Sequence, residues 1–184
     1  MQDLQVIGDF ASERFGASYL RRLNGLGFLI CAGGLGFAYY AQFYLGLEPC
    51  PLCIFQRLAL LILGLAFLLA TVHNPNDWGA RNDWGARAYG ALIGLVAGIG
   101  AGIAARHVWL QHLPLEDAPR CGPGLDYLLE TLPLNEIVRE VLTGSGECAK
   151  VDWTLLSLSI PEWTLLLFLG LGVLGVFGNW RRRD

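Results

Sequence analysis

The sequence predicts an all-α membrane protein, built as a bundle of four transmembrane helices. Two observations predict this fold. Of the 184 residues, 54% are hydrophobic and only 16% are charged, whereas soluble domains carry about 25% charged residues. In addition, four stretches of at least 18 residues contain no charge, namely 23–47, 58–76, 88–105 and 163–180. A bilayer core requires about 17–25 helical residues, so each stretch is long enough to span it.

The composition also excludes other classes of protein. Disordered chains combine low hydrophobicity with high charge, which is the reverse of this sequence. A formal net charge of −3 offers no basic surface to phosphates, so we expect no nucleic-acid partner. The lipid bilayer is the first partner that the sequence predicts.

The charge-free stretches divide the chain into a membrane domain and two flanking segments. The membrane domain is predicted at residues 23–180, between an N-terminal segment of residues 1–22 and a tail of residues 181–184. Its helices are expected at about 23–47, 52–72, 88–108 and 163–180. The first helix is longer than the roughly 7–15 apolar residues of a signal peptide, so we expect it to be retained.

Basic residues predict which side of the membrane each loop occupies. Eight Lys and Arg residues lie on the side of the two termini, and three lie in the long connection on the other side. Since positively charged segments stay in the cytoplasm, both termini and the loop 73–87 are predicted to be cytoplasmic. The short loop 48–51 and the long loop 109–162 are then periplasmic.

The third predicted helix carries a glycine at every fourth position, at Gly90, Gly94, Gly98 and Gly102. Small residues allow neighbouring helices to approach closely, and van der Waals packing drives helix association in lipid. We therefore expect these four glycines to form a packing ridge.

The long periplasmic loop contains apolar stripes of its own. Two stripes repeat at i, i+3, i+4 and i+7 and are separated by Pro133, so they predict two short amphipathic helices. The stretch 153–160 is expected to lie on the membrane surface, because Trp153 and Trp163 suit the interface. The two stripes are Leu125, Leu128, Leu129 and Leu132, then Leu134, Ile137, Val138 and Val141.

Four of the five cysteines fall on the predicted periplasmic side. Cys50 and Cys53 form a Cys-Pro-Leu-Cys motif at the start of the second helix, and Cys121 and Cys148 share the long loop. Glycines around the latter two predict mobile, accessible segments. Two pairs in an oxidising compartment indicate two disulfides. Zinc is the rival interpretation, but it needs four convergent ligands, so no metal is expected. Cys31, inside the first helix, is expected to be inert and buried.

The close spacing of Cys50 and Cys53 favours a redox-active pair over a structural one. A Cys-x-x-Cys ring is too small to restrict the unfolded chain strongly. At a helix N-terminus the peptide dipoles favour a thiolate, which is both a nucleophile and a leaving group. Arg57 follows Cys53 by four residues on the same helical face and can stabilise that thiolate. The alternative is that Arg57 anchors the helix by extending to the lipid headgroups.

Two other classes of protein remain open at this point. A non-enzymatic scaffold or adhesion protein would hold its outer loops with permanently oxidised structural disulfides. A channel or transporter would line its path with paired charges, which the four charge-free stretches do not contain.

The segment 50–57 (CPLCIFQR), at the start of the second of four helices, resembles the bacterial disulfide bond formation protein B (DsbB) family. Segments 144–149 (GSGECA) and 160–163 (IPEW) resemble the outer loop of that family. The resemblance covers about residues 23–180. It implies a thiol oxidase of the bacterial inner membrane that reoxidises a periplasmic, DsbA-like thioredoxin-fold oxidase. The electrons would pass to ubiquinone or menaquinone. A dithiol and a quinone each exchange two electrons, so neither a metal nor a flavin is expected.

The resemblance also implies roles for individual residues. Cys121 would form the mixed disulfide with the partner, and Cys148 would carry the reducing equivalents to Cys50. Arg57 and His107 would bind the quinone. From the residues alone, an interfacial histidine that faces the headgroups is the favoured interpretation of His107, and only the resemblance makes the quinone role an equal alternative. The catalytic residues that the resemblance implies are Cys50, Cys53, Cys121 and Cys148.

Overall fold

The computed structural model describes most of the chain. The described residues are 2–73, 84–114, 130–131, 133–144, 146–149, 151 and 153–180, and for 2–18, 134, 140, 142 and 147 only the backbone is described. Cys121, most of the loop 73–87, most of the first predicted loop helix around 125–132, and the tail 181–184 lie outside the described residues.

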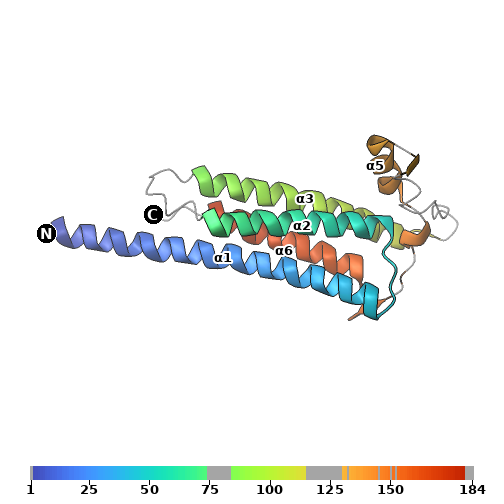
Figure 1. The fold of residues 1–184 in the computed structure, drawn as a ribbon. Helices are drawn as coiled ribbons and strands as arrows, with labels where there is room; N and C mark the ends of the chain where they lie inside the picture. Colours follow the sequence, from blue (N-terminus) through green and yellow to red (C-terminus); the bar gives the residue numbers. More distant parts are fainter. Residues whose placement is uncertain are drawn as a thin grey trace.

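Four long helices form the body of the protein and lie beside one another (Figure 1). Each contains a segment that is long and apolar enough to cross a bilayer, which confirms the prediction of an all-α, four-helix, multi-pass membrane protein. α1 begins and α6 ends at one end of the bundle, and we call the opposite end, where α2 begins, the cysteine end (Figure 1). The helices are α1 (Gln2–Tyr44), α2 (Pro51–His73), α3 (Trp84–Gln111) and α6 (Ile160–Trp180).

α1 is much longer than the sequence analysis expected. It runs without interruption from Gln2, so the N-terminal segment and the first membrane span are one helix. No proline occurs in this part of the chain to remove a backbone donor or force a kink. Only the part Tyr19–Tyr44 is apolar enough to cross a bilayer. The helix ends where Gly46 adopts a φ of 66° and the N–H of Leu47 donates to the carbonyl of Ala41 (3.2 Å).

The connection between α3 and α6 contains short elements at the cysteine end. α5 lies where the second apolar stripe predicts a helix, whereas the hairpin that follows was not predicted. Its turn residues, Leu156 and Ser157, have φ of 53° and 66°, a conformation that glycine or asparagine normally supplies in such turns. The elements are α5 (Leu134–Thr143), the 3₁₀ helix η1 (Gly146–Ala149), β1 (Thr154–Leu155) and β2 (Leu158–Ser159).

α3 and α6 approach each other closely because glycines lie in their contact. At these glycines an added Cβ would overlap a side chain of the other helix: Gly94 with Val176, Gly100 with Phe168, and Gly175 with Ile93. Gly98 and Gly102 of the predicted ridge have no such neighbour within 4 Å, so the four-glycine ridge is wrong in its second half. A step of four residues turns a helix by about 40° more than a full turn, and a straight row of glycines therefore rotates away from the contact.

Two apolar clusters form the interior. The larger lies along the bundle and contains the fully buried side chains of Phe67, Ile93 and Phe168. The smaller lies at the cysteine end, where residues of α5 and η1 pack against the beginning of α2 and the end of α3. This second cluster holds the long connection against the bundle.

A buried pair of amides joins α1 to α6 near the other end of the bundle. Asn24 and Asn179 exchange two hydrogen bonds, of 3.2 and 3.1 Å, and Asn179 Nδ2 also donates to the carbonyl of Gly175 (2.8 Å). Hydrogen bonds between membrane helices contribute roughly 0.6 kcal/mol on average and up to about 1.7 kcal/mol. The pair sets the register of α1 against α6.

The glycine contact predicts that Gly175→Ala destabilises the bundle. The new methyl group would overlap Ile93, and overpacking of this kind costs about 1–3 kcal/mol. The matched control is Gly170→Ala on the same helix, because no atom lies within 4 Å of its added Cβ and alanine is the better helix former. Thermal unfolding in detergent should show a lower Tm for Gly175→Ala alone, and equal Tm values for the two variants would contradict the prediction.

Candidate active site

Cys50 and Cys53 lie at the N-terminus of α2. The helix begins at Pro51, whose fixed φ and missing N–H suit a first turn, so Cys50 directly precedes the helix and Cys53 lies in its first turn. The N–H of Ile54 donates to the carbonyl of Cys50 (3.2 Å). The two Sγ atoms are 3.4 Å apart, well beyond a disulfide bond of about 2.05 Å. The pair is in its dithiol form in this structure, at the positive end of the helix dipole.

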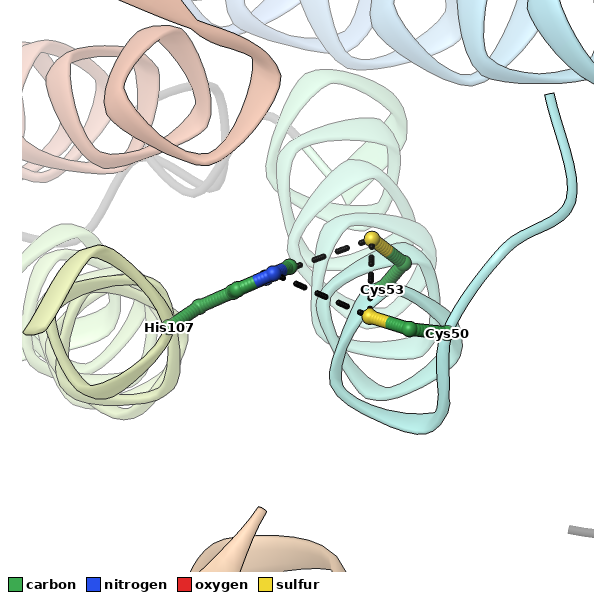
Figure 2. A group of neighbouring side chains, drawn as sticks. All are labelled: Cys50, Cys53 and His107. Carbon is green, nitrogen blue, oxygen red and sulfur yellow. Dashed lines mark hydrogen bonds between the residues drawn. The ribbon is translucent and has the colours of Figure 1, made fainter. Parts of the chain in front are cut away.

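His107 projects from α3 toward both sulfur atoms (Figure 2). Its Nε2 lies 3.7 Å from Cys50 Sγ, and its Nδ1 lies 4.0 Å from Cys53 Sγ. Only 2% of its surface is exposed, so this side chain does not face the lipid headgroups. The structure thus places His107 of α3 next to Cys50 and Cys53, which precede it in the sequence by 57 and 54 residues.

Gln56 is the hydrogen-bond partner of the His107 imidazole at Nδ1. The buried amide Nε2 lies 3.0 Å from His107 Nδ1. Because an amide NH₂ group can only donate, this contact makes Nδ1 the acceptor and places the imidazole proton on Nε2, next to Cys50. Cys50 Sγ in turn donates to Cys53 Sγ. When Cys53 is a thiolate, four groups therefore form one chain of donors that ends on its sulfur.

Gln56 was not predicted as a site residue, although the sequence contains one signal for it. The residue is polar, lies in a largely apolar helix and follows Cys53 by three positions, on the same helical face. A polar side chain at such a position in a membrane helix usually faces the interior of the bundle and takes part in function.

Arg57 is held by α1 rather than directed at Cys53. Its Nη1 donates to Gln42 Oε1, its Nη2 donates to the carbonyl of Ala38 (3.0 Å), and the guanidinium lies 5.4 Å from the centre of the Tyr39 ring. These contacts fix the plane of the guanidinium at the wall of the bundle interior. They involve three residues of the last two turns of α1, which no local spacing in the sequence relates to Arg57.

A cavity of about 640 Å³ opens beside these groups. Polar side chains from α2 and α3 meet at one part of its wall, and apolar and aromatic side chains from α1, α6 and the hairpin form most of the remainder. Sites for small organic ligands have this composition, a mostly apolar cavity with a few convergent polar groups. The polar group includes Cys50, Cys53, Gln56, Arg57 and His107, and the apolar wall includes Phe37, Ala41, Leu47, Trp153, Leu155, Ile160 and Trp163.

The hairpin is attached to the helices around the cavity. Trp163 Nε1 donates to the carbonyl of Leu155 (3.1 Å), and the hydroxyl of Ser159 donates to Gln111 Oε1 (2.7 Å). The rings of Phe37 and Trp153 lie 5.7 Å apart. The connection before α6 thereby contributes one wall of the cavity.

Cys148 is buried, in contrast to the accessible position that its glycine-rich surroundings predicted. It lies in η1, is 1% exposed, and belongs to the same apolar cluster as Cys50. The prediction was wrong because side chains of α3 and α5 cover it, among them Leu110, Ile137 and Val141. The pairing with Cys121 stays a prediction, because Cys121 lies outside the described residues. Cys31 is buried in the bundle, against Gly64 of α2.

A dithiol at a helix N-terminus, beside a buried imidazole and an apolar cavity in a four-helix membrane bundle, defines a membrane-embedded protein suited to thiol–disulfide exchange. Comparisons with known proteins identify the family within this class. Residues 20–178 match the family model described as "Disulfide bond formation protein DsbB", and the chain belongs to this family.

Similar proteins named "Disulfide bond formation protein B" cover most of the chain. The protein of Methylococcus capsulatus (strain Bath) is 51% identical over 155 residues, which are 84% of this chain and 91% of that protein. The protein of Xanthomonas campestris pv. campestris (strain 8004) is 49% identical over 158 residues, 86% of this chain and 89% of that protein. That of Nitrosococcus oceani is 50% identical over 152 residues, 83% and 86% of the two chains. The family membership supports a disulfide-forming oxidoreductase rather than a non-enzymatic scaffold.

The donor chain predicts the tautomer of His107. In the reduced protein, ¹⁵N chemical shifts should show the proton on Nε2, because Gln56 donates to Nδ1. Gln56→Leu removes that donor and should produce a mixture of both tautomers. His112, whose Nδ1 lies 2.9 Å from the carbonyl of Val108, is the internal control and should keep its shifts. A proton on Nδ1 of His107 in the unsubstituted protein would contradict this chain of donors.

Proposed function

We propose that this chain is a thiol oxidase of the bacterial inner membrane that reoxidises a periplasmic, DsbA-like dithiol oxidase and transfers the electrons to membrane quinone. Family membership supports the general part, disulfide bond formation. One observation carries the specific part: Cys53, Arg57 and His107 line the same apolar cavity in a membrane-spanning bundle. A thiol oxidase with a lipid-soluble electron acceptor requires this combination.

The distribution of basic residues supports a periplasmic cysteine end. Arg21 and Arg22 lie on α1 toward the end of the bundle opposite the cysteine end, and Arg181, Arg182 and Arg183 follow α6 in the sequence. By the positive-inside rule that end faces the cytoplasm. The dithiol and the long connection then face the compartment in which disulfides are formed.

In the proposed relay, a thiolate of the reduced partner attacks Cys121 in a Cys121–Cys148 disulfide. The Cys121–Cys148 bond breaks, a mixed disulfide with the partner forms, and Cys148 leaves as a thiolate. Cys148 then attacks Cys50 in a Cys50–Cys53 disulfide, so a Cys50–Cys148 disulfide forms and Cys53 leaves as a thiolate. The second thiolate of the partner attacks the mixed disulfide and releases the oxidised partner and a Cys121 thiolate, which attacks Cys148, restores the Cys121–Cys148 disulfide and frees Cys50. The packing of Cys148 in one apolar cluster with Cys50, with Cys53 packed against it, supports an exchange between the two pairs.

The cavity beside Cys53 fits a quinone in its chemistry: its walls are mostly apolar and aromatic, and a fixed cation and an imidazole lie at the polar part. A bound quinone would supply an acceptor for two electrons and two protons. The chain's own groups have three tasks there. The donor chain from Gln56 stabilises the Cys53 thiolate, Arg57 provides a preorganised cation for negative charge that develops on a carbonyl oxygen, and His107 holds a proton on Nε2.

Replacing Arg57 tests the quinone step. Arg57→Ala should weaken apparent quinone affinity by about tenfold or more, equivalent to about 1.4 kcal/mol, whereas Arg57→Lys keeps the charge, loses the planar fork, and should be impaired less. Gln42→Leu should shift the quinone KM in the same direction by removing the acceptor that orients Nη1. The assay is steady-state quinone reduction with reduced partner protein at varied quinone concentration. Arg22→Ala, which removes the same charge far from the cavity, is the control. An unchanged quinone KM and kcat in Arg57→Ala would leave Arg57 as a headgroup anchor.

Replacing Cys148 tests the thiol relay. Cys148→Ala leaves Cys121 without a disulfide partner, so this variant should not oxidise the reduced partner protein. A partner protein that keeps only its attacking cysteine should instead accumulate on the unsubstituted chain as a covalent adduct through Cys121, visible on a non-reducing gel and identified by peptide mapping. The double variant Cys50→Ser/Cys53→Ser should oxidise the partner once and then stop. An adduct mapped to Cys50, or sustained quinone reduction by the double variant, would refute the proposed order.

A further inference from the structure

Cys50, Cys53 and His107 are arranged as three ligands of a tetrahedral metal site (Figure 2). The two Sγ atoms are 3.4 Å apart, and Cys50 Sγ is 3.7 Å from His107 Nε2. With Zn–S bonds of about 2.3 Å and Zn–N bonds of about 2.0 Å, the ligand atoms of a tetrahedral site stand roughly 3.5–3.8 Å apart. These two separations match this spacing, and the ligand atoms of all three residues lie within 4.8 Å of one another.

The surroundings of these three residues also suit a metal ion. Gln56 lies against Nδ1 of His107, and a metal-bound histidine normally uses its second nitrogen to donate to such a partner. Rotation of the terminal amide by half a turn presents Oε1 in place of the NH₂ group, so Gln56 can serve the metal-bound tautomer as well. The adjoining cavity, which all three residues line, leaves room for a fourth ligand such as water.

We propose that the dithiol form of this site binds one soft divalent cation, Zn²⁺ or Cd²⁺, through Cys50 Sγ, Cys53 Sγ and His107 Nε2, and that the bound ion blocks reoxidation of the pair. Binding replaces both thiol protons, which are released to solvent, and leaves a neutral unit of one divalent cation and two thiolates. The disulfide form has no thiolates to offer, so the site exists only in the reduced protein. The binding follows from the geometry alone, whereas the block on reoxidation rests on the proposed function.

The sequence predicts no zinc site, because zinc needs four convergent ligands and the sequence does not bring them together. In the structure a third ligand comes from α3, 54 residues after Cys53. A site with three protein ligands keeps its fourth position open.

Cadmium titration of the reduced protein tests the binding. The protein carries Cys121→Ser and Cys148→Ser so that the other pair cannot contribute, and thiolate-to-cadmium absorption in the ultraviolet is the readout. One equivalent should bind, with no signal after oxidation of Cys50 and Cys53 to the disulfide. Cys53→Ser should abolish the signal, and Gln56→Leu should weaken binding by about 10–100-fold, as loss of a partner to a metal-bound histidine does. Cys31→Ala and His112→Ala are the matched controls and should bind as before.

Binding through His107 distinguishes the proposed site from chelation by two thiols alone, and it can be tested. His107→Ala should weaken Cd²⁺ binding at least as much as Gln56→Leu, and X-ray absorption of the zinc-loaded protein should show two sulfur ligands and one imidazole nitrogen. Equal affinity in His107→Ala, or a zinc shell without imidazole, would overturn the site. A signal that persists in Cys50→Ser/Cys53→Ser would also overturn it.

Quinone reduction by the protein without cysteine substitutions tests separately whether the bound ion blocks reoxidation of Cys50 and Cys53. Zinc at concentrations that fill the reduced site should stop quinone reduction, and a chelator should restore it. Normal turnover with the site filled would overturn the block while leaving the binding intact. A protein that binds Cd²⁺ as expected but never reduces quinone would refute the proposed function and not the metal site.

Discussion

A polar side chain inside a membrane-spanning bundle has no water to bind, so its partner must come from the protein itself. Every buried side-chain nitrogen and oxygen in the described part of this chain has such a partner. The requirement is met mainly between helices rather than within them. Asn24 pairs with Asn179 at one end of the bundle, and Gln56 pairs with His107 at the other. These contacts fix the register of α1 on α6 and of α2 on α3, and the second of them also positions the dithiol.

The helices pack closely in one part of the bundle and surround a cavity in another. Glycines bring α3 and α6 together along the bundle, while the cavity at the cysteine end lies between α1, α2 and the beginning of α6. Arg57 of α2 links two sides of the cavity, because its guanidinium donates hydrogen bonds to Gln42 and Ala38 of α1. His107 therefore comes from one of the two helices that glycines bring together, and α1 supplies part of the apolar wall that a ligand would meet.

The number of helices could be predicted from the sequence because placing a charged side chain in lipid costs much free energy. Membrane-spanning segments therefore appear in the sequence as long stretches without charged residues. Cys53 and Arg57 could be identified because they share one helix, where spacing determines which residues are neighbours. Gln42 and Gln56 could not be assigned partners, because contacts between helices depend on a register that no local pattern encodes. Cys148 was misjudged for the same reason, since its glycine-rich neighbours predict exposure and the side chains that cover it belong to α3 and α5.

The order of donors around the dithiol makes its two sulfur atoms chemically unequal. Gln56, His107 and Cys50 each donate toward the next group, and electron density is therefore best accommodated on Cys53, the last acceptor. When the two sulfurs are joined in a disulfide, Cys50 has no proton left to donate, so this bias belongs to the reduced pair alone. A symmetric pair would share the negative charge between both sulfurs. The buried amide of Gln56, which touches neither sulfur, thus helps to decide which sulfur of the reduced pair carries the charge.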